Sequence, residues 1–305
     1  MTKYYDVNLK QDRNKILKEN KNFYSYFGLI QDKKLLDEIY NKHKPRVVIH
    51  LAAQAGVRYS IDNPDSYAES NLIGTFHILE MVRKFNTEHL LMASTSSVYG
   101  NNEDLPFNEN QKCDNPISFY AATKKSNEVM AHSYSHLFNI PTTIFRFFTV
   151  YGPWGRPDMA MFKFTNKILS GKPIDIYNNG KMKRDFTYID DLIKAISILI
   201  DIIPPNPENR SNKIDCDNIS KSAPYRIVNI GSSKPTNLMD CISEIETALG
   251  TVSKKNFLDL QDGDIKETSS NTDLLYALTG FRVETSLKVG ISEFINWYKY
   301  YYNYN

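Results

Sequence analysis

The most constraining feature of this sequence is the alternation, from residue 35 onward, of short apolar runs with longer amphipathic segments. A run that is apolar throughout is typical of a strand buried on both faces, and a 3.6-residue apolar period is typical of a helix packed on one side. Three runs read as strands: Arg46–Leu51, His89–Ser94 and Thr142–Phe148. Three segments read as helices: Leu35–His43, Ser66–Phe85 and Ser118–Phe138. Successive strand–helix units predict the α/β class with a Rossmann-like, doubly wound parallel sheet.

The second half of the chain has a different character, because loops such as GPWGRPD interrupt its helical and strand-like segments. Helical patterns recur at Leu238–Leu249 and Val289–Tyr302. We therefore predict a dinucleotide-binding domain over residues 1–150 and a mainly substrate-binding, smaller α/β portion over 151–305. Within the latter, 181–203 is predicted to return to the first domain.

Charge and cysteine usage exclude several classes of function. The chain has 37 Lys and Arg against 35 Asp and Glu, dispersed along its length, so no nucleic-acid partner is expected. The start of the sequence is polar, and the longest apolar stretch, Ala195–Ile203, contains Asp201. We predict a cytoplasmic protein with no membrane partner. The cysteines are three and widely separated, without a CxxC pair, so neither a metal site nor a disulfide framework is expected.

Tyr120 and Lys124 are four residues apart in SFYAATKK, which places both on one face of a helix. An ammonium group near a phenol favours the phenolate and lowers a pKa that is about 10 when unperturbed. The pair can therefore act as a general base near neutral pH. A surface pair without function has the same spacing, so the interpretation depends on its context.

A run of hydroxyl side chains, Ser94 to Ser97 in ASTSSVYG, ends the second predicted strand. Ligands bind at the carboxyl ends of strands in doubly wound sheets, so this run and the Tyr120 helix are expected to converge. Serine and threonine also favour caps and turns, which is the alternative interpretation.

At these residues the chain resembles the extended short-chain dehydrogenase/reductases of the NAD-dependent epimerase/dehydratase type, and among them the UDP-glucuronate 4-epimerases. The resemblance covers nearly the whole chain through these motifs: YYDVNLK, HLAAQAGVRYS, NLIGT, ASTSSVYG, YAATKK, RFFTVYGPWGRPDMA, YNNGKMKRDFTYIDD, SAPYRIVNIG and QDGDIKET.

The resemblance implies a role for each matching residue. Tyr120 corresponds to the base, Lys124 to its activator and nicotinamide-ribose contact, and Thr95 to the hydroxyl that shares the substrate proton. NAD is the implied cofactor, and a UDP-sugar is the implied substrate. The implied cofactor-binding residues are Leu51, Ala52, Ala53, Gln54, Asn71, Ser94, Tyr120, Lys124 and Phe147. The implied substrate-binding residues are Ser96, Ser97, Thr149, Arg156, Tyr177 and Arg184.

The implied reaction is epimerisation at C4 by a transient transfer of hydride to bound NAD, interconverting UDP-glucuronate and UDP-galacturonate. Related dehydratases and decarboxylases carry acidic residues where this chain has Ser96 and Ser97. Neutral hydroxyls suit a substrate carboxylate, which a glutamate would repel. Two alternatives stay open: an epimerase of UDP-glucose or a UDP-N-acetylhexosamine, or a non-catalytic remnant that binds a nucleotide sugar or a sister subunit.

The chain departs from the family's pattern at its start, where the resemblance implies a strand, a GxxGxxG turn and a helix that hold the cofactor pyrophosphate. Tyr4–Lys10 matches the stretch after the family's second strand, so we expect roughly 30 residues of the Rossmann unit to be missing and the first domain to be truncated. The resemblance also implies a homodimer, formed through the helices at 66–85 and 118–138.

Overall fold

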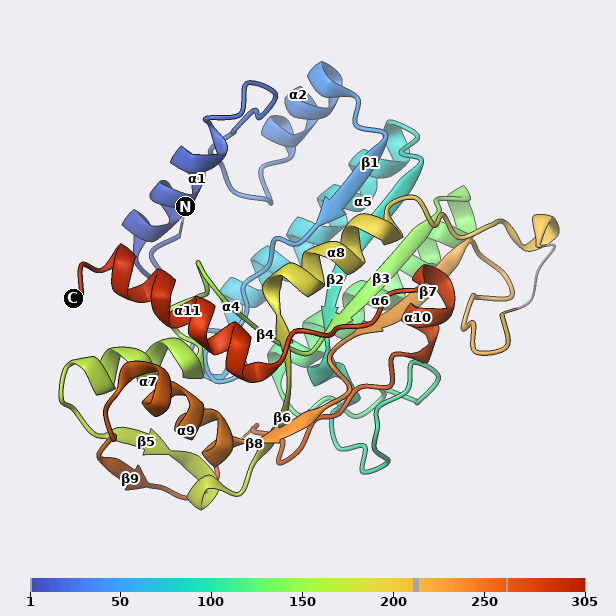
Figure 1. Ribbon diagram of the computed structural model, residues 1–305. Helices are drawn as coiled ribbons and strands as arrows, with labels where there is room; N and C mark the ends of the chain where they lie inside the picture. Colours follow the sequence, from blue (N-terminus) through green and yellow to red (C-terminus); the bar gives the residue numbers. More distant parts are fainter. Residues whose placement is uncertain (1, 211–213, 262, 305) are drawn as a thin grey trace.

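The computed structural model describes residues 2–210, 214–261 and 263–304. Its main sheet has four parallel strands in the order β1–β2–β3–β7, which confirms the predicted fold class. The first three are the predicted strands with slightly different ends. The strands are β1 (Val47–His50), β2 (His89–Thr95), β3 (Thr142–Phe147) and β7 (Tyr225–Ile230). The strand β7 was not predicted, and it returns the chain to the main sheet after a long excursion (Figure 1).

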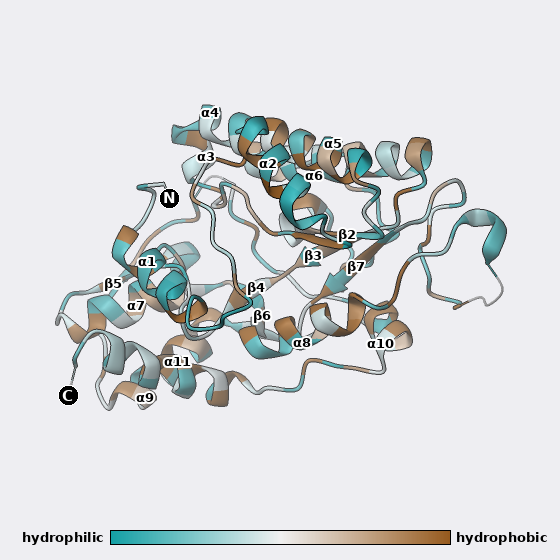
Figure 2. Cartoon of the chain, turned by 90° about the horizontal axis from the view of Figure 1, so that it is seen from above, coloured by the Kyte–Doolittle hydropathy of each residue, from teal (hydrophilic) through white to brown (hydrophobic). Residues whose placement is uncertain are grey.

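Helices cover both faces of this sheet, as Figure 2 shows. On one face lie α2 (Lys33–His43), α5 (Gly74–Lys84) and α6 (Phe119–Phe138), and on the other α8 (Ile189–Leu199) and α10 (Asp273–Thr279). Side chains alternate across a strand, so Leu90 and Met92 pack under α5 and α6 while Leu91 packs with α8 and α10. Burial on both faces explains why the middle of β2 is apolar.

Local capping sets where the predicted helices begin. Asp32 accepts hydrogen bonds from the backbone N–H groups of Lys34 and Leu35, so α2 begins two residues earlier than its apolar period indicated. Ser118 caps α6 by accepting from the N–H of Ala121.

The prediction of a single helix over 66–85 was wrong, because the structure divides this segment into three parts. These parts are α4 (Pro64–Tyr67), a π-helical stretch over Ala68–Ile73, and α5. Besides α2, this segment is preceded in the chain by α1 (Val7–Leu17), which was not predicted, and by the short α3 (Tyr59–Asp62).

The rest of the chain builds a second, smaller set of layers with its own apolar core. A mixed sheet joins β4 (Thr149–Tyr151), β6 (Lys183–Tyr188) and β8 (Pro235–Asn237), and a strand pair joins β5 (Ile174–Ile176) and β9 (Lys255–Phe257). The helices that pack there are α7 (Ala160–Leu169), α9 (Leu238–Leu249) and α11 (Leu287–Tyr301). In Figure 1, α1 lies beside α11.

Within the described residues, β1 pairs with β2 alone and forms one edge of the main sheet. Ile49 and Leu51 are 40% and 50% exposed there. Several large apolar side chains that precede α2 are also exposed: Phe23, Tyr24, Tyr26, Phe27 and Leu29. Strands of parallel sheets are usually covered on both faces, so this edge presents an unusual amount of apolar surface.

No helix in the described ranges has the length and apolar character needed to cross a bilayer. The same ranges bring together no group of three or more His, Cys, Asp or Glu side chains suited to hold a metal ion.

Candidate functional site

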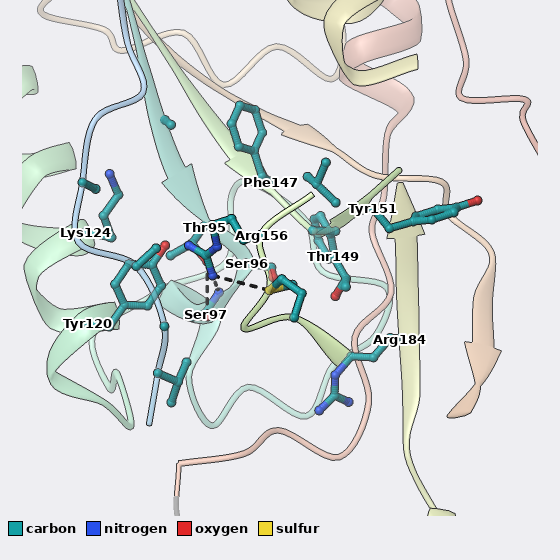
Figure 3. A pocket seen from close by; sticks show the side chains of 18 of the residues that line it. Thr95, Ser96, Ser97, Tyr120, Lys124, Phe147, Thr149, Tyr151, Arg156 and Arg184 are labelled. Carbon is teal, nitrogen blue, oxygen red and sulfur yellow. Dashed lines mark hydrogen bonds between the residues drawn. The ribbon is translucent and has the colours of Figure 1, made fainter. Parts of the chain in front are cut away.

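A cavity of about 770 Å³ lies between the two sets of layers, at the carboxyl ends of β2 and β3. Most of the predicted site residues line it, and Figure 3 labels the side chains of those from Thr95 onward. These residues are Leu51, Ala53, Ser94, Thr95, Ser96, Ser97, Tyr120, Lys124, Phe147, Thr149, Arg156 and Arg184. The position agrees with the rule that ligands bind beyond the carboxyl ends of strands in doubly wound sheets.

Tyr120 lies in the first turn of α6 with its phenol directed toward the end of β2 (Figure 3). Burial raises the pKa of Tyr120, while the nearby Arg156 guanidinium and a hydrogen bond with Thr95 lower it. The Tyr67 ring packs against Tyr120 edge to face, with 6.0 Å between ring centroids. The structure therefore brings the phenol and the Thr95 hydroxyl together, as the sequence predicted.

Lys124 is on the same face of α6, one turn further on, and is only 2% exposed. Burial lowers the pKa of its ammonium group to about 8, and the charge of Glu128 opposes this shift. The sequence predicted that Lys124 would lower the pKa of Tyr120, but in this structure burial outweighs the neighbouring charges and the pKa lies above its ordinary value; the charge that opposes this rise is that of Arg156. Figure 3 shows why, since the Lys124 side chain extends away from the phenol.

The lowered pKa of Lys124 predicts a pH-dependent gain in stability when its charge is removed. Its pKa falls from 10.5 in the unfolded chain to about 8 in the fold, so the charged form opposes folding at pH 7. Lys124→Met should raise the free energy of unfolding at pH 7 by up to about 3 kcal/mol, and the gain should shrink as pH rises from 8 to 10.5. Chemical denaturation of both proteins across this pH range measures it. A gain that is equal at pH 7 and pH 10.5 would contradict a charged, buried Lys124.

A buried ion pair fastens α6 to the sheet beneath the cavity. The Glu128 carboxylate accepts from Arg146 Nε and Nη2, both at 2.9 Å, and from Ser94 Oγ at 2.7 Å. The side chains of Glu128 and Arg146 are 2% and 1% exposed. Ser94 and Arg146 are register partners on β2 and β3, so one carboxylate ties together both strands and the helix that carries Tyr120. The Ser94 hydroxyl therefore donates its hydrogen bond to Glu128.

The hydroxyl run both caps a turn and lines the cavity. Thr95 Oγ1 accepts from the backbone N–H of Ser97 at 3.2 Å and thereby caps the short 3₁₀ turn Ser96–Tyr99. Ser96, Ser97 and Thr149 are half-buried cavity walls. The capping interpretation is thus correct for Thr95, and the run also lies in the wall of the cavity, where the strand-end rule placed it.

Four of the predicted site residues do not line this cavity: Ala52, Gln54, Asn71 and Tyr177. Ala52 is exposed, Gln54 is buried within the 51–56 loop, and Asn71 is buried against the Gln54 backbone. Asn71, inside the π-helical stretch, accepts from the N–H of Gln54 at 2.8 Å and donates to the Gln54 carbonyl and to Thr123, each at 3.0 Å. The hydrogen bonds of its amide join the 51–56 loop to α6. Asn71 therefore supports the site without lining the cavity.

Tyr177 is the fourth of these residues, and it belongs to a cluster at the far end of the cavity. The Arg58 guanidinium lies 4.3 Å from the Tyr177 ring centroid and pairs with Asp264 at 2.6 Å. Arg184 lines the cavity beside this cluster, and burial lowers its pKa. The structure therefore places Arg184 and Tyr177, two of the predicted substrate-binding residues, close to Arg58, which was not predicted.

Several other residues that line the cavity were not predicted from the sequence. The most informative are Arg13, Trp154 and Asp264. Each stands within or next to a motif that carried the resemblance: YYDVNLK, GPWGRPD and QDGDIKET. No residue spacing marks them as functional, because their partners come from distant parts of the chain.

Comparison with known proteins decides the family. The model of the NAD dependent epimerase/dehydratase family matches residues 4–211. The chain belongs to this family. It is 49% identical over 299 residues to a probable UDP-glucuronate 4-epimerase of Rhizobium meliloti, covering 98% of this chain and 87% of that protein. It is 41% identical over 307 residues to UDP-glucuronate 4-epimerase 1 of Arabidopsis thaliana, and the match covers 99% of this chain and 70% of that protein.

A solved structure of the family has the same fold. The crystal structure of UDP-glucuronic acid 4-epimerase from Bacillus cereus, in complex with UDP-glucuronic acid and NAD, superposes with a TM-score of 0.85. It is 31% identical to this chain, and the match covers 97% of this chain and 88% of that one.

One end of the cavity has the groups that suit the nicotinamide ribose of NAD. The Tyr120 phenol and the Lys124 ammonium supply polar contacts, and Leu51 and Phe147 supply apolar walls. The pyrophosphate of such a cofactor needs glycines that let backbone amides approach it, and this sequence contains no GxxGxxG run. The match of the described residues to NAD therefore concerns its nicotinamide end.

Proposed function

We propose that this chain is a UDP-glucuronate 4-epimerase that interconverts UDP-glucuronate and UDP-galacturonate with NAD. The observation that carries the proposal is the placement, in one cavity, of Tyr120 and Thr95 beside the neutral hydroxyls of Ser96, Ser97 and Thr149. The names of the similar proteins support the same substrate.

The chemistry follows from the groups at the end of β2. Bound NAD supplies the acceptor and donor of the C4 hydride. Tyr120 accepts the proton of the sugar 4-hydroxyl, sharing it with the Thr95 hydroxyl, and later returns it. Arg156 favours the phenolate form of Tyr120 and thus the proton transfer. Lys124 contacts the nicotinamide ribose, and its cationic form dominates below its pKa of about 8.

The hydroxyl run protects the 4-keto sugar from losing CO₂. A 4-keto-glucuronate is a β-keto acid, and it loses CO₂ when the bond to its carboxylate stands perpendicular to the carbonyl plane. Donors from Ser96, Ser97 and Thr149 hold the carboxylate out of that orientation. Arg156 lies at the same end of the cavity as Tyr120, so it serves the acidic sugar rather than the diphosphate (Figure 3).

The nucleotide is held at the other end, by the second set of layers. Arg184 anchors the diphosphate through its guanidinium group, and the Tyr177 ring packs near the uridine. We divide the chain accordingly into a cofactor-binding part, 1–150, and a mainly substrate-binding part, 151–305. The protein forms a homodimer through α5 and α6, which expose apolar side chains to solvent: Phe76, Val129, Leu137 and Phe138.

Substitutions at Ser97 test whether the site selects a uronate. Ser97→Glu should weaken the binding of UDP-glucuronate by about tenfold or more through charge repulsion and leave the binding of UDP-glucose within about twofold. Ser97→Ala, the matched control, removes one donor and should weaken UDP-glucuronate by only about threefold. Isothermal titration calorimetry measures both ligands. Equal effects of Ser97→Glu on the two ligands would show that the hydroxyl run does not face the carboxylate.

A further inference from the structure

The N-terminal segment of the chain holds the loop that carries Arg156. Arg13, on α1, donates through Nη2 to the carbonyl oxygens of Trp154 and Gly155, the latter at 3.1 Å. Its Nη1 donates to the Tyr5 hydroxyl at 2.9 Å. One guanidinium thus binds two consecutive carbonyls of the GPWGRPD loop from a helix more than a hundred residues away in sequence.

A second link runs through Asp158 at the end of the same loop. Asp158 Oδ2 accepts from the Tyr4 hydroxyl at 3.1 Å and from Arg156 Nη2 at 2.9 Å. Burial and the Asp158 charge raise the pKa of Tyr4 to about 12, so its hydroxyl remains a donor throughout the neutral range. Tyr4 packs against Tyr59, with 4.7 Å between ring centroids. Tyr4 therefore helps to fix the carboxylate that orients the Arg156 guanidinium.

The loop needs such support because its backbone is strained. Trp154 has φ of +61°, in the left-handed region that side chains other than glycine rarely adopt. Its ring packs against Trp297 and Tyr301 of α11, with ring centroids 5.3 and 5.1 Å away. Tyr301 in turn donates to Asp12 on α1 at 2.5 Å. The loop is thus held between α1 and α11, and Figure 1 shows α1 close to the C-terminal end of α11.

We propose that Arg13 and Tyr4 are positioning residues for substrate recognition: they hold the 152–158 loop so that Arg156 faces Tyr120 and the hydroxyl run. The inference rests on the proposed function, because it assigns Arg156 to the acidic sugar. Arg13 also lines the cavity, so the experiment must separate positioning from direct contact with the nucleotide.

Binding of two nucleotides separates these roles. Arg13→Gln should weaken UDP-glucuronate by about tenfold and leave UDP within about twofold, because only the sugar end depends on the loop. Arg13→Lys keeps the charge but loses the two-carbonyl geometry, so it should not restore binding. Tyr4→Phe removes only the hydroxyl donated to Asp158 and should weaken UDP-glucuronate about threefold. Lys15→Gln, at an exposed position on the same helix, is the control and should change neither ligand.

The outcomes are read by calorimetry together with thermal denaturation of each variant. Equal losses of UDP and UDP-glucuronate in Arg13→Gln would make Arg13 a direct nucleotide contact and overturn the inference. Unchanged UDP-glucuronate binding in Arg13→Gln and Tyr4→Phe, with a loss in Arg156→Ala, would overturn it while the proposed function stands. If Arg156→Ala has no effect and the wild type binds UDP-glucose as well as UDP-glucuronate, the proposed function itself fails. Should Arg13→Gln not fold, Tyr4→Phe alone decides.

Discussion

Tyr120→Phe is expected to lower turnover of UDP-glucuronate by roughly 10²- to 10⁴-fold, because it removes the group that exchanges a proton with the sugar 4-hydroxyl. Binding of UDP-glucuronate should change little, since the phenol contributes most in the transition state. Tyr120 lies in the first turn of α6, where the ring remains after substitution and continues to pack against Tyr67. The measurement is kcat with saturating NAD, beside the Kd of UDP-glucuronate from calorimetry.

Tyr134→Phe is the matched control for this substitution. Tyr134 lies on the same helix, and its hydroxyl donates to Glu80 at 2.7 Å, away from the cavity. Its loss should leave kcat within about twofold, because an exposed or half-buried hydrogen bond contributes only to stability. Retention of most activity by Tyr120→Phe would rule out Tyr120 as the base.

Glu128→Ala should cost roughly 3–5 kcal/mol of unfolding free energy, because it leaves the Arg146 charge buried without its partner. Arg146 is 1% exposed, and both of its hydrogen bonds to Glu128 would be lost. Ser94 would lose its acceptor as well. Urea denaturation, with the slope compared between variants, measures the loss.

Two further variants distinguish the buried pair from a general effect of charge on α6. Lys125 is 27% exposed and contacts Glu128 at 3.3 Å, so Lys125→Ala should cost less than about 1 kcal/mol. The double variant Glu128→Leu with Arg146→Met removes both charges and should recover most of the stability lost in Glu128→Ala. A double variant no more stable than Glu128→Ala would show that the pair itself, and not an uncompensated charge, stabilises the fold.

The strands β2 and β3 were predictable because both are buried on both faces, and burial leaves a mainly apolar run in the sequence, as in HLLMAST and TTIFRF. The edge strand β1 is only partly buried, and β7 was not predicted. The helix ends were less predictable, since capping by Asp32 or Ser118 depends on a few local bonds. The π-helical stretch has no periodic signature, because it arises where Asn71 turns inward to bind the 51–56 loop.

The candidate site was predictable where it depends on one helix or one strand end. The spacing of Tyr120 and Lys124 fixes their shared face, and the strand-end rule brings Thr95 to them. The cation that acts on Tyr120 was not predictable, because Arg156 reaches it from a loop whose position depends on α1 and α11. Pairings between segments this far apart leave no pattern in either segment, which is why the role of Arg13 emerged only from the structure.

The fate of deuterium at C4 of UDP-glucuronate tests the central claim most directly. The substrate is incubated with NAD and the protein, both as the 305-residue chain and in a form that carries an added strand–GxxGxxG–helix unit to hold the pyrophosphate. Whichever of these forms binds NAD should yield UDP-galacturonate that retains deuterium at C4, without release of CO₂. The Tyr120→Phe variant of that form should yield no product. Loss of the deuterium to water, or epimerisation of UDP-glucose with UDP-glucuronate left unchanged, would contradict the proposed function.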